Sequence, residues 1–474
     1  MTETWGNAGN HDPDSRRMVE TIRARTRAYG GYPRHDGDTL DLLALKIETS
    51  HWRRVTAHRL LDMAEGGKMD ALTLAGALLE LKLFLFEEER SRLAATVREP
   101  EILGRVLAQT GIRHPEDPNH HLLAGPDTDL KIEVNRASPW PFQRWKEIRA
   151  FGEHEFTPGG VRYRGLEMAP GDMILANANL DGNFVFSSLP DPKGLFSHAA
   201  VFVILEEEGR RYPAVVETYE RGVRAVPLSV FLNARYVAYA EIYRHRGVTS
   251  DHHAGLAEAA MRVVRETRGY NFHSCDTARD YISCTSLGRI LLEDVGLPPV
   301  EPRSGVVNPG ILRTLDYIDY RGVDPFFAPV DYLLNPDFRF VGFVDNNQVH
   351  RVVAREVVEA VFRERVARGT LGHRRLPLPY YLNLWAIGQV RRGTTVGRVI
   401  SRFAGFDAES LPKGPDPTLA IIPPAERELT RAVRRVLPYV EERLEDLEEL
   451  DFLAFLRDPD VRRTAADGLG MVWL

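Results

Sequence analysis

The chain has 474 residues, of which 43% are hydrophobic and 27% charged, so it is long enough for two or three globular domains and too apolar for wholesale disorder. The formal net charge is −6 and the 61 basic residues are spread along the sequence, which argues against nucleic acid or an anionic membrane as a partner. Two cysteines are too few for a disulfide-stapled secreted scaffold.

The N-terminus carries no recognisable export signal. Residues 1–13 are polar and rich in Gly and Asn, and no basic segment followed by an apolar one occurs there. We therefore expect a disordered start and a cytoplasmic protein, with a specialised secretion system as the route if the protein is exported. The most apolar run, residues 71–86, is interrupted by Glu80 and Lys82, which favours a buried helix over a transmembrane segment.

Residues 1–150 predict a helical N-terminal domain. A first helix is expected from Asp14 or Ser15 to Tyr29. Apolar residues at helical spacing continue over 40–60 and, after a Gly-Gly break, over 72–93. Residues 115–141 are rich in Pro, Asn, His and Asp, which is typical of a linker or loop.

Residues 151–320 predict an α+β domain. From about Val161 the chain shows short runs rich in Val, Ile, Phe and Tyr with short connections, which indicate a small antiparallel sheet. The expected strands are MILANA, HAAVFVILE, AVVETYE, VRAVPL and VAYAEIYRH. Helices are expected over 251–268 and 284–295.

Residues 321–474 predict a mainly helical C-terminal region. One further strand, FRFVGFV, precedes a helix with an apolar stripe from Val353 to Phe362. A long amphipathic helix is expected to open after Pro423-Pro424. The predicted fold class is therefore α+β, with helical regions on both sides of the middle domain, and these flanks could bind a protein partner.

Cys284 is the candidate nucleophile. It begins a predicted helix, where free N–H groups and the helix dipole favour a thiolate and could also hold an oxyanion. His198, at the start of a strand, is the candidate base, and Glu217 inside AVVETYE could orient its imidazole. Taken singly, each has a plainer interpretation: a small buried residue, a surface histidine, and a Glu on a solvated strand face.

The order of four motifs, PGDMIL, FSHAAVFV, VVETYERGVRAVPLSVFL and YISCTSL, resembles the YiiX/YebB-like hydrolases of the permuted NlpC and LRAT-like branch of papain-like folds. In that family Gly-Asp opens the first strand, His begins the second, a Glu or another polar residue lies on the third, and Cys opens a helix. Gly171-Asp172, His198, Glu217 and Cys284 match this order. Two positions depart from the pattern: Asn271 replaces an Asp, and Ser286 replaces the Glu two residues after the cysteine.

The resemblance implies a cysteine hydrolase that cleaves a peptide or amide bond through a Cys-His-Glu triad and a thioester acyl-enzyme. The substrate would be a peptide or an acyl-bearing small molecule. Tyr270 and Tyr281 are candidate donors to the oxyanion or substrate, with Thr285 as a small polar neighbour of the nucleophile. Two alternatives stay open: a lipid acyl hydrolase or acyltransferase of the LRAT type, and a non-catalytic binding protein on the same fold.

Other chemistry finds no support in the sequence. Cys275 and Cys284 are nine positions apart, which suits neither a zinc site nor a C-x-x-C redox motif. The His pairs at 120/121 and 252/253 lack the spacing of a helical metal site, and no phosphate-binding glycine loop occurs. We expect no metal and no cofactor.

Overall fold

The structure is a computed structural model that describes residues 13–29, 39–83, 85, 87–109, 154–178, 187–207, 209–219, 222–232, 236–273, 278–320, 326–369, 378–404 and 411–469. The N-terminal segment expected to be disordered, the expected linker at 115–141, the pair His120/His121 and Cys275 lie outside these residues.

The N-terminal region is helical, as predicted. It comprises α1 (Pro13–Tyr29), α2 (Thr39–Glu65), α3 (Ala71–Leu81), α4 (Glu87–Thr96) and α5 (Pro100–Gln109). These helices enclose an apolar core of their own, which includes Ile22, Leu60, Leu74 and Leu93.

The prediction of one continuous helix over 72–93 is wrong, because this stretch forms two helices, α3 and α4. Lys82 has a left-handed conformation (φ 52°) and ends α3, and Leu83 then forms a parallel bridge with Asp345. A continuous helix could not make this contact, so pairing with a distant strand overrides the local helical pattern.

The middle of the chain forms a six-stranded sheet in the order β11-β8-β4-β5-β6-β7, with every neighbouring pair antiparallel. A strand from beyond residue 320 completes this sheet at the β8 edge. All six predicted strands are confirmed within a few residues. They are β4 (Met173–Ala178), β5 (His198–Glu207), β6 (Arg210–Tyr219), β7 (Gly222–Pro227), β8 (Val237–His245) and β11 (Phe338–Asp345).

Five shorter strands accompany the large sheet. A separate three-stranded sheet is formed by β1 (His154–Thr157), β2 (Gly160–Tyr163) and β3 (Leu166–Met168). A short parallel pair joins β9 (Gly269–Tyr270) to β10 (Tyr281–Ile282), directly before the predicted nucleophile.

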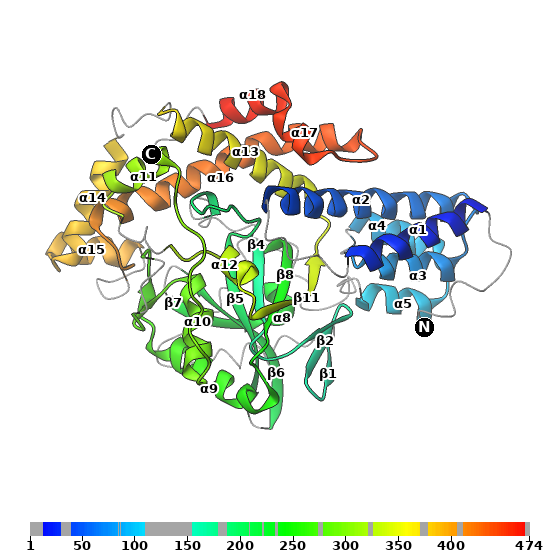
Figure 1. Ribbon diagram of the computed structural model, residues 1–474, viewed down its shortest axis with the longest axis horizontal. Coiled ribbons are helices and arrows are strands. Elements are labelled where there is room, and N and C mark those ends of the chain that lie inside the picture. Colours follow the sequence, from blue (N-terminus) through cyan, green and yellow to red (C-terminus); the bar gives the residue numbers. More distant parts are fainter. Residues whose placement is uncertain are drawn as a thin grey trace.

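Both faces of the large sheet are covered. On β5 the side chains alternate: Val201 and Val203 belong to the main core, whereas Ala200 and Phe202 pack on the opposite face with β2, β3 and α8 (Leu228–Phe231). The main core is covered by α9 (His253–Glu266), which follows a 3₁₀ turn at Ser250–His252, and by α10 (Cys284–Asp294). Figure 1 shows α9 and α10 beside the strands and the N-terminal helices at the far right.

The C-terminal helices pack above the sheet (Figure 1). The expectation that a helix opens after Pro423-Pro424 is wrong, because α16 already begins at Asp416 and runs through both prolines. Ile421, Ile422 and Ala425 are buried in the main core, and this packing offsets the helix-breaking cost of proline. The remaining helices are α11 (Pro309–Tyr317), α12 (Val330–Leu334), α13 (Val349–Ala367), α14 (Leu378–Arg391), α15 (Thr395–Ala404), α16 (Asp416–Glu445), α17 (Phe452–Arg457) and α18 (Pro459–Gly468).

Buried ion pairs attach α2 to the central sheet. Lys46 Nζ lies 2.8 Å from Glu241 Oε2 on β8, and Arg53 Nη1 lies 3.2 Å from Asp345 Oδ2 on β11. The molecule is therefore α+β, with an antiparallel sheet at its centre and helices on both sides. Among the residues described, no helix is both long enough and apolar enough to cross a membrane.

Candidate active site

Cys284 is the first residue of α10 and is buried. Ser283 caps the helix: its Oγ accepts the N–H of Ser286 at 3.1 Å, and the Oγ of Ser286 accepts the N–H of Ser283 at 2.9 Å. Ser286, one of the two departures from the family pattern, thus completes a capping box that usually uses Glu or Gln. The cap keeps the thiol at the positive end of the helix.

His198 and Glu217 come together across two paired strands. The β5–β6 register places Glu217 opposite Ala200, two residues from His198 and on the same face of the sheet. His198 Nε2 lies 2.9 Å from Glu217 Oε2, and both side chains are buried. The interpretation of Glu217 as a residue on a solvated face is therefore excluded.

The second carboxylate oxygen of Glu217 is held by two residues that the sequence did not single out. Arg224 Nε and Tyr236 Oη each donate to Glu217 Oε1 at 2.7 Å. Arg224 lies directly opposite Glu217 in the β6–β7 hairpin. The sequence could have indicated Arg224, because an arginine within the otherwise apolar strand VRAVPL is expected to lie opposite a glutamate of the preceding strand.

These contacts set the charges of the pair. Burial disfavours the charged carboxylate, but Arg224 and the bond to His198 lower the pKa of Glu217 to about 2. Burial likewise disfavours the imidazolium, but interactions with Cys284 and Glu217 raise the pKa of His198 to about 9. Glu217 is therefore ionised at neutral pH and stabilises a protonated His198.

The thiol is the third member of this arrangement. Burial opposes its ionisation, but His198, the backbone N–H of Ala199 and Tyr270 together lower the pKa of Cys284 below its ordinary value. His198 Nδ1, the nitrogen that does not face Glu217, is buried and has no hydrogen-bond partner in the described part of the chain within standard geometry. The imidazole can therefore accept the thiol proton at Nδ1 while Glu217 holds Nε2.

The three other predicted site residues lie in different settings. Tyr270 Oη is 3.8 Å from Cys284 Sγ, so Tyr270 lies at the thiol. Tyr281, three residues before the cysteine, lines a separate cavity of about 740 Å³ together with Lys413 and Arg391. Thr285 is buried, and its Oγ1 donates to the carbonyl of Phe327 at 3.0 Å, so this hydroxyl holds the helix in place.

Asn271, the other departure from the family pattern, organises the approach to the nucleophile. Its Oδ1 accepts the N–H of His273 at 2.8 Å, and Nδ2 donates to the carbonyl of Tyr281 at 3.4 Å. Asn271 also forms a parallel bridge with Lys413. An amide can both donate and accept here, so Asn271 joins β9 to β10 beside the thiol.

The Gly-Asp motif at the start of β4 is structural in this chain. Gly171 has a φ of 91°, which favours glycine, and Asp172 is fully buried. Arg244 on β8 contacts both oxygens of Asp172 at 2.6 and 2.8 Å, and Oδ2 also accepts the N–H of Ala169. The motif thus fixes the entry to β4 against its neighbouring strand.

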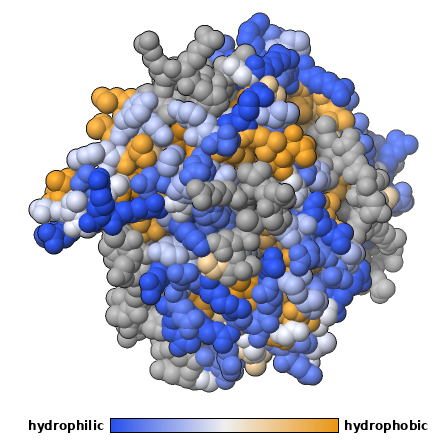
Figure 2. All heavy atoms as spheres, turned by 60° about the vertical axis from the view of Figure 1, so that its left-hand side comes forward, coloured by the Kyte–Doolittle hydropathy of each residue, from blue (hydrophilic) through white to orange (hydrophobic). Residues whose placement is uncertain are grey.

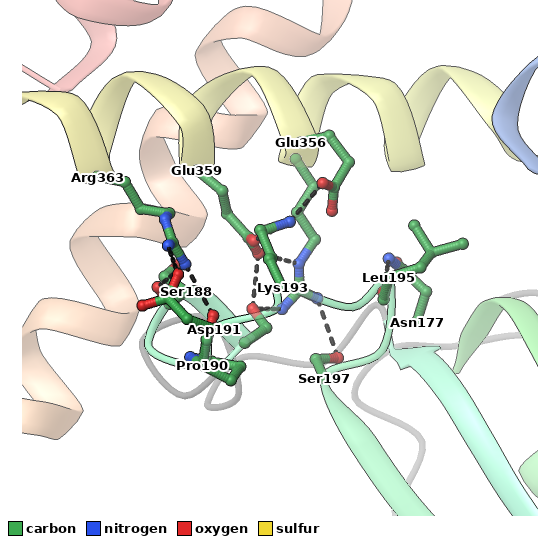
Figure 3. A network of polar contacts seen from close by, with 12 residues as sticks. Asn177, Ser188, Pro190, Asp191, Lys193, Leu195, Ser197, Glu356, Glu359 and Arg363 are labelled. Carbon is green, nitrogen blue, oxygen red and sulfur yellow. Dashed lines mark hydrogen bonds and ion pairs between the residues drawn. The ribbon is translucent and has the colours of Figure 1, made fainter. Parts of the chain in front are cut away.

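A buried polar network joins the segment before His198 to α13 (Figure 3). Lys193 contacts Glu356 and Glu359, and Arg363 pairs with Asp191 at 2.5 Å. Figure 3 shows Ser197 at the base of this network, one residue before the candidate base. Helix α13 therefore contacts the segment that leads into the strand carrying His198.

No group of three or more His, Cys, Asp or Glu side chains within the described residues is placed to hold a metal ion. The pair His252/His253 is described: His252 Nδ1 accepts the N–H of Thr249 at 3.1 Å, and His253 begins α9. Each of these histidines thus contributes to the start of a helix.

Comparison with known families identifies the middle of the chain. Residues 167–287, about a quarter of the sequence, match the family described as permuted papain-like amidase enzymes, YaeF/YiiX, C92 family. No curated protein and no solved structure is significantly similar to the chain. The matched segment contains His198, Glu217, Tyr270 and Cys284 and has a YiiX-like permuted papain fold, which supports hydrolase activity of the amidase type.

Proposed function

We propose that this permuted papain-like domain is a thiol amidase in which Cys284 is the nucleophile, His198 the general base and acid, and Glu217 the residue that orients His198. The observation that carries the proposal is the buried Cys284–His198–Glu217 arrangement, with a lowered thiol pKa and a carboxylate 2.9 Å from the imidazole. A purely structural thiol needs neither feature.

His198 takes the proton of Cys284 at Nδ1, so the pair is an imidazolium and a thiolate at neutral pH. The reaction begins when this thiolate attacks the carbonyl carbon of an amide. The C=O π electrons move to the oxygen, giving a tetrahedral oxyanion. The N–H groups at the start of α10 and the hydroxyl of Tyr270 are the donors available to this oxyanion. When the oxyanion collapses, the C–N bond breaks and His198 protonates the departing amine.

A thioester on Cys284 remains. His198 then removes a proton from water, the hydroxide oxygen attacks the thioester carbonyl, and the C–S bond breaks as His198 returns the proton to sulfur. The products are a carboxylic acid and the free thiol. Glu217 stays ionised throughout and stabilises the imidazolium in both steps.

The test is the pH dependence of iodoacetamide labelling at Cys284, read by mass spectrometry. In the parent protein we expect Cys284 to be labelled well below pH 8.5, the ordinary thiol pKa. In His198→Ala the pH at which labelling begins should rise toward that ordinary value. His245→Ala is the matched control, because His245 is also a buried strand histidine but packs against Phe338. It should leave the labelling profile unchanged.

Hydrolase activity can be measured on the same protein preparation. Incubation with a panel of peptide amides and acyl esters should give a covalent adduct on Cys284 whose mass equals that of the acyl group. If Cys284 labels no faster than Cys275, and His198→Ala makes no difference, the thiol amidase proposal fails and a binding protein on the same fold takes its place.

A further inference from the structure

Helices α14 and α15 display an unusual amount of apolar surface. Of the eleven large hydrophobic side chains that are exposed in the described part of the chain, seven lie on these two helices. Phe403 is 88% exposed and Leu378 is 70% exposed. We call the seven the hairpin patch: Leu378, Tyr381, Leu382, Trp385, Val396, Val399 and Phe403.

The patch follows helical spacing. On α14 its members recur every three or four residues from Leu378 to Trp385, and on α15 they recur in the same way from Val396 to Phe403. Each helix therefore carries an apolar stripe that no described element covers. Gly397 is buried where α15 meets α14: a Cβ there would lie 2.1 Å from the carbonyl oxygen of Gln389. This close crossing holds the two helices together as one unit.

The charge of this region is opposite to that of the whole chain. Between positions 378 and 404, which span α14, α15 and their connection, the sequence has four arginines and no Asp or Glu, although the chain has a net charge of −6. Arg398 and Arg402 lie on α15 between the patch residues and are exposed. Arg398 contacts the hydroxyl of Thr395, and within the described residues no ion pair joins Arg398 or Arg402 to an acidic side chain. The average charge of the chain argues against an anionic membrane as a partner, but the local charge of this hairpin is positive. An anionic surface would complement this local combination of apolar and cationic side chains.

The hairpin projects from the molecule. In Figure 1 α14 and α15 lie at the left-hand end, opposite the N-terminal helices. Figure 2 turns that end toward the viewer and shows hydrophobic residues at the surface among hydrophilic ones. A protein partner would need a concave surface that matches the projecting hairpin. A lipid bilayer needs no matching shape, because its lipids rearrange around inserted side chains.

We propose that the hairpin patch binds the interfacial region of an anionic lipid bilayer. The aliphatic side chains and Phe403 would enter the acyl boundary, and Trp385 and Tyr381 would lie at headgroup level, where aromatic side chains with a polar atom are favoured. Arg398 and Arg402 would contact lipid phosphates. The helices lie in the interface in this arrangement and do not span the membrane.

The patch connects to the candidate active site through one segment. Arg391, the last residue of α14, contacts Gly414 and Asp416. In the same segment, the N–H of Lys413 donates to the carbonyl of Tyr270 at 2.8 Å, next to Cys284. The segment that precedes α16 therefore contacts both the last residue of α14 and β9, the strand that carries Tyr270. Bilayer binding does not require the catalytic proposal to hold.

The test is cosedimentation of the full chain with vesicles of phosphatidylcholine alone or mixed with phosphatidylglycerol. We expect binding to the anionic vesicles that weakens with added salt, and little binding to the neutral ones. The double variant Arg398→Gln/Arg402→Gln should weaken binding to anionic vesicles by roughly tenfold or more. Trp385→Ser/Phe403→Ser should weaken it by at least about tenfold, because the buried apolar area is lost.

Matched controls come from the other end of the molecule. Phe156→Ser removes an exposed aromatic side chain on β1, and Arg16→Gln/Arg17→Gln removes two exposed arginines on α1. Both should bind vesicles like the parent protein. Iodoacetamide labelling of Cys284 in the hairpin variants should also match the parent, which separates this result from failure of the catalytic site.

Three outcomes would overturn the proposal. One is no binding of the parent protein to anionic vesicles, and another is hairpin variants that bind as tightly as the controls. The third is a lipid-free parent that light scattering shows to be a dimer and that Phe403→Ser converts to a monomer. In that case a second copy of the chain, and no bilayer, occupies the patch.

Discussion

Arg355 on α13 donates from Nη1 to the Oγ of Ser197 at 3.1 Å, directly before His198. The same guanidinium contacts Glu359 Oε1 at 2.9 Å, Ser187 Oγ at 2.8 Å and the carbonyl of Ala178 at 3.1 Å. A helix outside the segment matched by the amidase family thus holds both β4 and the start of β5. The C-terminal region is part of what positions the candidate base.

Replacing Arg355 should be costly. We expect Arg355→Met to lower the free energy of unfolding by about 3–5 kcal/mol, because it leaves Glu359 buried with one cation fewer. Urea denaturation measures this change. Arg368→Met at the C-cap of the same helix removes an exposed partner of Glu364 and should change stability by less than about 1 kcal/mol. Equal losses in the two variants would contradict a stabilising role for the buried network.

The network should also make stability depend on pH through Glu356. Burial raises the pKa of Glu356 to about 7, with Glu359 adding to the rise and Lys193 opposing it. The folded protein therefore binds this proton more tightly than the unfolded chain does. The resulting stabilisation is complete below about pH 4.5, the ordinary range of a glutamate, and is lost as the pH rises through 7.

Glu356→Gln removes that dependence. Relative to the parent, the variant should gain roughly 2–3 kcal/mol between pH 5 and pH 8, measured as the difference between urea unfolding free energies at each pH. Glu258→Gln on α9, which removes an exposed carboxylate, is measured over the same range as the surface control. A flat difference for Glu356→Gln would show that this carboxyl group does not titrate there.

The cap of α10 should influence the thiol. Ser283→Ala removes the acceptor for the N–H of Ser286, so we expect a loss of about 1 kcal/mol in stability and iodoacetamide labelling of Cys284 that requires a higher pH. Asp451→Ala removes the cap of α17 and should cost a similar amount without changing the labelling. If both variants label alike, the helix terminus does not lower the pKa of the thiol.

Tyr270 can be separated from Tyr281 by a pair of conservative substitutions. Tyr270→Phe removes a hydroxyl 3.8 Å from Cys284 Sγ and should lower kcat for amide hydrolysis by about 100-fold if that hydroxyl stabilises the oxyanion. Tyr281→Phe removes a hydroxyl at the separate cavity and should leave kcat close to that of the parent. A reversed order of effects would assign the donor to Tyr281.

The raised pKa of His198 predicts the alkaline limit of hydrolysis. Because this pKa is about 9, the imidazolium that protonates the leaving amine persists up to that pH and is lost above it. Amide hydrolysis should therefore decline above about pH 9, while iodoacetamide labelling, which needs only the thiolate, should not. Parallel declines of the two rates would instead indicate loss of the fold.

Much of the candidate site could be predicted from local pattern and chain order. Ser283 and the apolar spacing after it place Cys284 at a helix start, and alternating apolar residues place His198 and Glu217 on strands. These features depend on neighbours a few residues away, so a single sequence carries them. The apolar stripes of α14 and α15, and the lack of Asp and Glu in both helices, can also be read from the sequence.

The tertiary structure decided which site residues contact one another. The register of β5 and β6 brings Glu217 to His198, and the β6–β7 hairpin adds Arg224. Core packing stabilises α16 although the helix contains two consecutive prolines. The bridge from Leu83 to Asp345 ends a helix that the local apolar pattern would continue. Each of these outcomes depends on free energies of contacts between residues far apart in the chain. Local spacing therefore determined the elements and the order of the site residues, whereas long-range packing decided their distances, their burial and their pKa values.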